Sequence, residues 1–108
     1  MINANLEQFL DTGWFNEATL YYEGYIYWCE GGIYHKKNNS FYFSVYRFPA
    51  QIINEKYFKR LHSEEPFKYL YEDTGKNEDE VKERFLKAKI FNGKSFWDVE
   101  KELAWLDE

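Results

Sequence analysis

The fold is decided by one run of eight residues, Phe41-Tyr42-Phe43-Ser44-Val45-Tyr46-Arg47-Phe48. Aromatic and β-branched residues dominate this run, as is typical of strands. Successive side chains of a strand point to opposite faces, so the odd-numbered residues 41–45 share one face and the even-numbered residues 42–46 share the other. The second face is amphipathic, and we expect it to be only partly covered. Pro49 should end the strand or place it at a sheet edge.

Two further strands are predicted before this run, over residues 19–22 and 25–29. Glu23-Gly24 between them is a tight-turn signal, and Glu30-Gly31-Gly32 marks a second break or a bulge. Residues 36–40 are polar and form a loop. The three strands are therefore expected to follow one another as antiparallel neighbours.

The sequence leaves the secondary structure in the middle of the chain open. Residues 51–62 leave two interpretations open, because their apolar spacing fits a helix and also tolerates a strand. We favour a short helix over residues 54–61. Residues 67–72 predict another strand, and residues 73–76 predict a turn.

A short helix is expected near the N-terminus, over residues 4–12. Asn3 is its expected cap and Gly13 its expected end. Its leucines and phenylalanine share one face, which should pack on the sheet.

Two helices are expected in the C-terminal third. Asn77 precedes an acidic first turn, which suits the helix dipole, and Asn92-Gly93 is expected to stop that helix. Ser95 begins the second helix, with Asp98 as a capping-box partner. The apolar residues of 96–106 should line one face of this helix.

Together these elements predict a single α+β domain spanning residues 1–108. Its antiparallel sheet has about three to four strands, over roughly residues 18–48 and 67–72, with the short N-terminal helix and the two C-terminal helices packed on one face. The connections are too short for parallel crossovers.

Composition excludes several classes of protein. Apolar residues make up 44% and charged residues 31% of the chain, which is typical of a globular domain and not of a disordered one. The longest apolar runs are too short to span a membrane, and the first residues lack the pattern of a signal peptide. Cys29 is the single cysteine, so no internal disulfide is possible. We therefore expect a cytoplasmic protein with no membrane association.

No set of residues specifies a reaction. Residues 88–95 match a loose phosphate-loop pattern, but Gly93 as a helix cap, Lys94 as a solvated side chain and Ser95 as an N-cap explain them better. The remaining nucleophile or metal-ligand candidates are Cys29, His35 and His62, and no spacing brings them together. We expect no catalytic residues, no metal and no cofactor.

The unusual feature is an aromatic content of 22%, combined with a net charge of -5. Tyrosine and tryptophan suit interfaces, although core packing is the alternative for each ring. The leading hypothesis is a small non-catalytic module for protein–protein interaction. Small acidic inhibitor and immunity-type proteins of bacteria or phages share this character, an analogy of composition alone. The candidate contact residues are Trp14, Glu17, Tyr22, Glu23, Tyr25, Tyr27 and Glu30. For Trp28 we prefer core packing.

Single-stranded nucleic-acid binding is the alternative hypothesis, because bases interleave with aromatic residues in segment 36–60. Its candidate contacts are Lys36, Lys37, Tyr42, Tyr46, Arg47, Lys56, Lys59 and Arg60. The acidic net charge disfavours it. A second alternative is an aromatic-lined pocket for a small ligand. Both a monomer and a homodimer are compatible with the sequence.

Overall fold

The central element of the fold is β3 (Ser40–Ile52), which contains the whole run of residues 41–48. The protein is represented by a computed structural model that describes residues 1–13, 17–35, 37, 40–54, 56–61 and 68–106. Pro49 was expected to end β3 or to place it at a sheet edge, and it does neither. It pairs with Tyr25, and its carbonyl accepts a hydrogen bond from the backbone N–H of Leu61 at 3.1 Å. The strand therefore continues past the proline, which has no N–H to donate.

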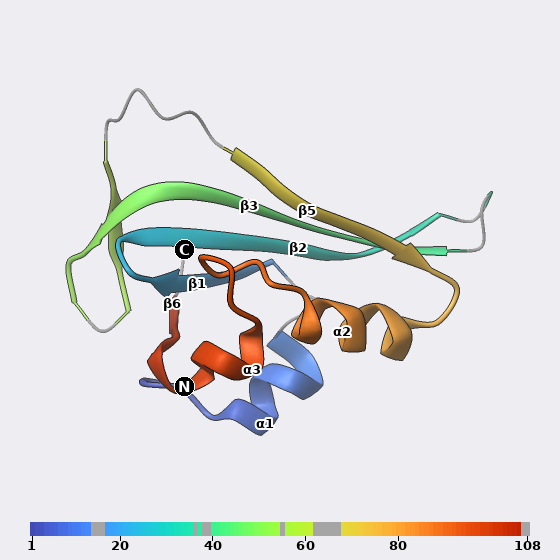
Figure 1. The fold of residues 1–108 in the computed structure, drawn as a ribbon, viewed down its shortest axis with the longest axis horizontal. Helices are drawn as coiled ribbons and strands as arrows, with labels where there is room; N and C mark the ends of the chain where they lie inside the picture. The colour runs from blue at the N-terminus through green and yellow to red at the C-terminus, as the bar shows by residue number, and fades with distance from the viewer. Residues whose placement is uncertain (14–16, 36, 38–39, 55, 62–67, 107–108) are drawn as a thin grey trace.

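Six antiparallel strands form one curled sheet in the order β4-β3-β2-β1-β6, with β5 also paired to β3 (Figure 1). The five strands besides β3 are β1 (Ala18–Tyr22), β2 (Tyr25–His35), β4 (Phe58–Arg60), β5 (Lys68–Gly75) and β6 (Ala104–Leu106). The expected count of three to four strands was too low. The tight turn at Glu23-Gly24 is confirmed by positive φ angles of 48° and 87°, and the bulge in β2 by a register shift between Glu30 and Ile33.

The strand β4 lies where we favoured a helix over residues 54–61, and that prediction was wrong. The side-chain oxygen of Asn54 accepts hydrogen bonds from the backbone N–H groups of Lys56 and Tyr57, at 2.9 and 3.2 Å. This arrangement turns the chain back on itself. Phe58 then pairs with Ile52, so the free edge of β3 decides the structure of the segment.

The last predicted helix is also shorter than expected. The capping box of Ser95 and Asp98 is confirmed, but α3 spans only Phe96–Val99 and is followed by a 3₁₀ turn over Glu100–Glu102. The chain then becomes extended as β6, in which Leu106 pairs with Thr19 of β1. Residues that the apolar spacing assigned to a helix therefore pair with the edge of β1 as a strand.

The N-terminal helix begins later than expected. The structure places α1 at Leu6–Gln8, continued by a wider π-helical turn over Phe9–Gly13. Its cap is Asn5, whose side chain accepts a hydrogen bond from Gln8 N at 3.0 Å. The predicted cap, Asn3, has another partner.

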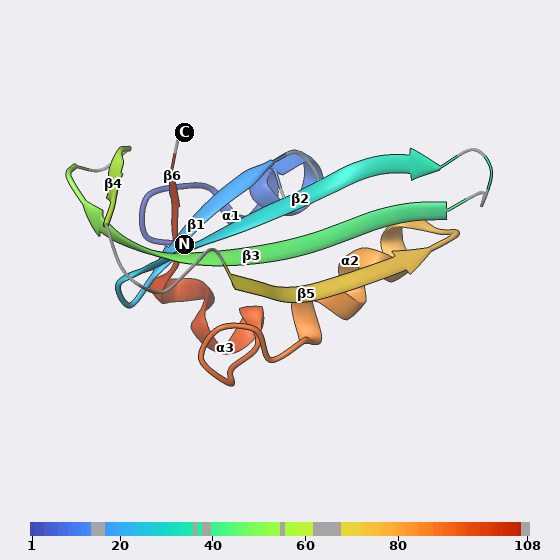
Figure 2. The same cartoon turned by 90° about the horizontal axis from the view of Figure 1, so that it is seen from above.

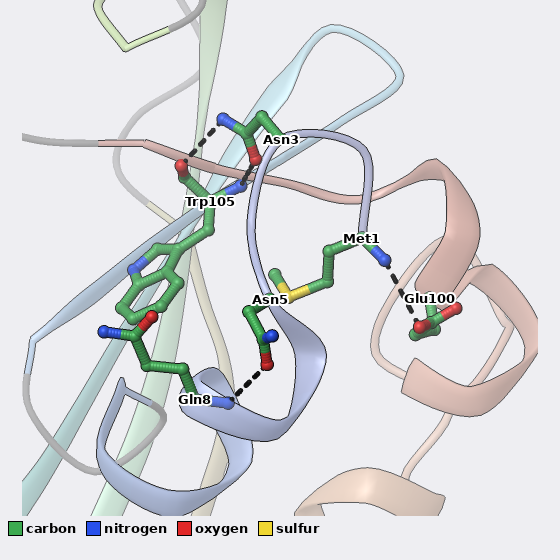
Figure 3. A network of polar contacts seen from close by, with 6 residues as sticks. All are labelled: Met1, Asn3, Asn5, Gln8, Glu100 and Trp105. Carbon is green, nitrogen blue, oxygen red and sulfur yellow. Dashed lines mark hydrogen bonds and ion pairs between the residues drawn. The ribbon is translucent and has the colours of Figure 1, made fainter.

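Asn3 joins the N-terminal segment to β6 (Figure 3). Its side chain donates to the carbonyl of Trp105 and accepts from the N–H of the same residue, both at 2.9 Å. Ile2 N donates to Leu103 O at 2.9 Å, and the Met1 amino group lies 3.2 Å from the carboxylate of Glu100. The Asn3 side chain thus satisfies both backbone groups of Trp105 at the outer edge of β6.

The helix α2 (Glu78–Lys87) begins at Asn77 as predicted. It ends at Lys87, with Ala88 extended, and so it stops before the Asn92-Gly93 pair that was expected to end it. Those two residues instead form a tight turn with positive φ angles of 52° and 79°. Gly93 therefore caps no helix.

An ion pair ties α2 to β5. Arg84 Nε lies 2.7 Å from Asp73 Oδ2, and the same guanidinium donates to the carbonyl of Thr74 at 3.1 Å. Asp73 and Thr74 belong to β5, which continues to Gly75. The turn predicted over residues 73–76 was therefore wrong at all but its last residue.

The main core lies between the sheet and the helices. All three helices lie on one face of the sheet (Figure 1), where Phe43 packs against Phe85 with ring centroids 4.7 Å apart. Antiparallel strands covered by helices on one face fit the expected α+β class. A second, smaller core fills the other face where β3 curls, and it consists of Ile26, Phe48, Ala50, Ala104 and Leu106.

Candidate functional site

The candidate site lies on the face of β2, β3 and β5 that is turned away from the helices, which we call the open face (Figure 2). On β3, Phe43 and Val45 are buried under the helices, whereas Tyr42, Ser44 and Tyr46 are half-buried on the opposite side. This confirms the alternation predicted for the strand. None of the helices in the described residues covers the open face. The second core occupies this face only where β3 curls.

An aromatic row crosses the open face. Trp28 of β2 pairs with Tyr46 of β3, and Tyr46 pairs with Tyr69 of β5. The rings of Tyr46 and Tyr69 meet edge to face, with centroids 5.0 Å apart and an interplanar angle of 72°. Tyr69 is 47% exposed. The row therefore presents aromatic surface to solvent at its β5 end, where a tyrosine can make both apolar and polar contacts.

An acidic row lies directly beside the aromatic row. Ser44 pairs with Glu30 on one side and with Glu72 on the other. Neighbouring strands are about 4.8 Å apart, so the backbones of the two glutamates are separated by about 10 Å. Glu17 is exposed and directly precedes Ala18, the first residue of β1 and the partner of Cys29, so a continued register would place it beside Glu30.

A bulge in β5 brings the two rows together. Val45 pairs with Tyr71 and Tyr46 with Tyr69, so Leu70 is an extra residue. Without it, Tyr69 and Glu72 would lie on opposite faces, since they are three positions apart. Desolvation raises the pKa of Tyr69, and the nearby Glu72 carboxylate raises it further. The Tyr69 hydroxyl is therefore neutral and lies beside an acidic side chain.

The predicted protein-contact residues do not form one surface. Glu30 belongs to the acidic row, and Glu17 is exposed directly before β1. Tyr22 and Tyr27 are buried, with exposures of 2% and 0%, so core packing holds for these rings and the expectation of surface contact is corrected. Trp14 lies outside the described residues.

The other two predicted contacts lie at the turn between β1 and β2. The Asn92 amide donates to the Glu23 carboxylate at 3.1 Å, and the Arg47 guanidinium carbon lies 4.4 Å from the centre of the Tyr25 ring. Arg47 also donates to the Asn92 side-chain oxygen at 3.5 Å. This network joins the turn to the loop after α2, so its polar groups already have partners within the fold.

The predicted nucleic-acid contacts are scattered. Tyr42 and Tyr46 lie on the open face, but Arg47 lies on the helix-covered side. Lys36 is outside the described residues. The exposed bases occur at opposite ends of the sheet, near the β2–β3 connection and around β4, and they are Lys37, Lys56, Lys59 and Arg60.

The thiol of Cys29 is not accessible to act as a nucleophile. Cys29 is fully buried, and desolvation strongly raises the pKa of its thiol. His35 lies in β2, and His62 is outside the described residues. The part of the chain that the structure describes contains no group of three or more His, Cys, Asp or Glu residues able to hold a metal ion.

Sequence reasoning missed two residues of this surface. Tyr69 and Glu72 fall in the strand predicted over residues 67–72, yet neither was selected as a contact. The alternating tyrosines of that segment were the available signal, but the bulge at Leu70 depends on pairing with β3. For Trp28, core packing is only half correct, because its side chain is partly buried against the second core.

Comparison with known proteins gives no family or relative: no protein-family model, no curated protein and no solved structure matches this chain. None of the helices in the described segments has the length and apolar character needed to span a bilayer. The geometry of the open face is therefore the basis for a functional proposal.

Proposed function

We propose that this chain is a non-catalytic module that binds another protein through its open face. The observation that supports this proposal is the aromatic row lying beside the acidic row on the side of the sheet opposite the helices. Tyrosine and tryptophan side chains, with apolar bodies and polar tips, dominate the binding energy of many protein interfaces. Flanking carboxylates add specificity and speed association with a partner of opposite charge.

The same geometry disfavours the nucleic-acid alternative. A strand of nucleic acid stacked on Tyr46 and Tyr69 would bring its phosphates near Glu30 and Glu72. Like charges at such short range repel, and stacking platforms for single strands normally lie in basic grooves. Arg47, the base nearest to the row in sequence, points to the other side of the sheet.

Site-specific photo-crosslinking tests the proposal. A photoreactive amino acid replaces Tyr69 on the open face in one variant and Glu83, exposed on α2, in a matched control. In cells that produce the protein, we expect a defined protein adduct from position 69 that persists after nuclease treatment, and none from position 83. Equal adducts from both positions, or a position-69 adduct that nuclease removes, would contradict the proposal.

A solution titration supplies the second arm. We expect no saturable change in tryptophan fluorescence when single-stranded DNA or RNA is added at low salt. Saturable quenching that high salt abolishes would favour the nucleic-acid alternative, because salt weakens contacts with phosphates.

A further inference from the structure

We infer that the open face recognises an arginine side chain of its partner, with the guanidinium stacked on the Tyr69 ring and hydrogen-bonded to the Glu72 carboxylate. This inference rests on the proposed function and names the chemistry that the partner must present. It concerns the β5 end of the two rows, where Tyr69 is 47% exposed and Glu72 is also exposed.

The two groups are close enough to act on one cation. Tyr69 pairs with Tyr46 and Glu72 pairs with Ser44, two positions apart on one face of β3, so a cation over the Tyr69 ring also lies near the Glu72 side chain. A cation is attracted to an aromatic face when it lies within about 6 Å of the ring centre. The edge-to-face contact with Tyr46 holds the Tyr69 ring in place. One guanidinium can therefore gain a stacking contact and an ionic hydrogen bond together.

The shape of the site favours arginine over lysine. A guanidinium is planar and weakly hydrated, so it can stack on a ring while its edge donates to a carboxylate, whereas an ammonium is a strongly hydrated point charge. The fold contains this stacking already. Arg60 lies 4.9 Å from the centre of the Phe48 ring, and Phe48 follows Tyr46 on the same face of β3. The fold thus already accommodates an arginine over an aromatic ring.

Charge complementarity identifies the occupant as cationic. Glu30 and Glu72 flank Ser44, and the paired residues of the aromatic and acidic rows include no Lys or Arg. Within the two rows, a partner arginine would therefore meet carboxylates and no like charge. An acidic partner or a phosphate would be repelled by the same groups.

Short peptides of defined chemistry test the inference by NMR. The probe is N-acetyl-Gly-Arg-Gly-amide, compared with the same peptide carrying lysine or the neutral isostere citrulline. We expect saturable amide shifts at Tyr69, Glu72 and Tyr46 with the arginine peptide, about threefold weaker binding with lysine, and none with citrulline. The first turn of α2, with Glu78, Asp79 and Glu80, is the internal control for charge without a ring.

Three variants separate the contributions of ring and charge. Glu72→Gln removes the carboxylate, Tyr69→Leu removes the ring, and Glu83→Gln makes the same charge change on exposed α2. We expect each of the first two to weaken arginine binding about threefold or more, and the third to leave it unchanged. Equal shifts at the open face and at the first turn of α2, or equal affinities for arginine and lysine, would overturn the inference. So would the absence of any shift at Tyr69.

The outcomes also separate the two proposals. A nuclease-resistant protein adduct at position 69 without arginine binding would leave the interaction surface standing and reject the arginine. The absence of an adduct would reject the interaction surface itself. Peptide shifts at Tyr69 would then give no evidence for a partner protein.

Discussion

Replacing Tyr27 by phenylalanine should stabilise the domain. The Tyr27 side chain is fully buried, with its ring 4.7 Å from that of Phe91, and its hydroxyl has no hydrogen-bond partner among the described residues. Burial raises the pKa of this phenol, and the neighbouring Arg47 counters part of the rise without completing a hydrogen bond of good geometry. Phenylalanine keeps the ring and its stacking while it removes the buried polar atom.

The expected magnitude follows from the cost of that atom. A buried polar group without a partner costs about 1–3 kcal/mol, and the attraction to Arg47 offsets part of it, so Tyr27→Phe should raise the free energy of unfolding by about 1 kcal/mol. Equilibrium unfolding in urea, followed by far-UV circular dichroism, measures this change. Tyr22→Phe is the matched control: Tyr22 is also buried, but its hydroxyl is not one of the buried polar atoms that lack a partner, so this variant should bring no such gain in stability. A loss of stability in Tyr27→Phe of 1 kcal/mol or more would refute the reasoning and show that the hydroxyl has a partner.

Three further predictions concern other parts of the fold. Gly24→Ala should destabilise the domain by about 1–2 kcal/mol in the same urea assay, because φ is +87° at this position. The new Cβ meets no atom within 4 Å, so the cost comes from backbone conformation alone. Gly13→Ala should destabilise the domain more, because its Cβ would lie 2.5 Å from the Trp105 ring. Asp98→Asn should lower stability at neutral pH but not in strong acid. The hydrogen bonds from Ser95 lower the pKa of Asp98 below 3.8, so the stabilisation by the Asp98 carboxylate is complete well above that value and is lost as pH falls through the depressed pKa. The unfolding curves of the two proteins should therefore converge at low pH. Cys29 should react with a thiol reagent such as Ellman's reagent only at the rate of unfolding, since it is buried and its pKa is raised; rapid labelling under native conditions would contradict the structure.

Local patterns predicted the elements that local interactions decide. The alternation in β3, the turn at Glu23-Gly24 and the caps at Asn77 and Ser95 each depend on residues a few positions apart. All of these were predicted, because side-chain alternation and cap geometry are properties of a short segment.

The two segments wrongly assigned to helices share one physical cause. Residues 54–61 and 104–106 have apolar spacings compatible with a helix, but the free edges of β3 and β1 recruit them as strands. A backbone edge in a sheet offers hydrogen bonds to whichever segment can reach it, and this choice is not encoded in the spacing of that segment. The displaced role of Asn3 has the same origin, because its side chain completes the edge of β6 at Trp105.

The candidate site depends on the same long-range pairing. Glu30 and Glu72 come from separate parts of the chain, and they lie on either side of Ser44 only because β2, β3 and β5 pair in this register. Residues 36–71 carry a net charge of +4, yet the strand at their centre faces solvent with tyrosines and serine beside carboxylates from its neighbours. Charge counted along the sequence therefore favoured nucleic acid for this segment, whereas charge counted across the strands favours a cationic partner. A binding face on a sheet is defined by its rows and not by its strands, so the register must be known before the partner can be inferred.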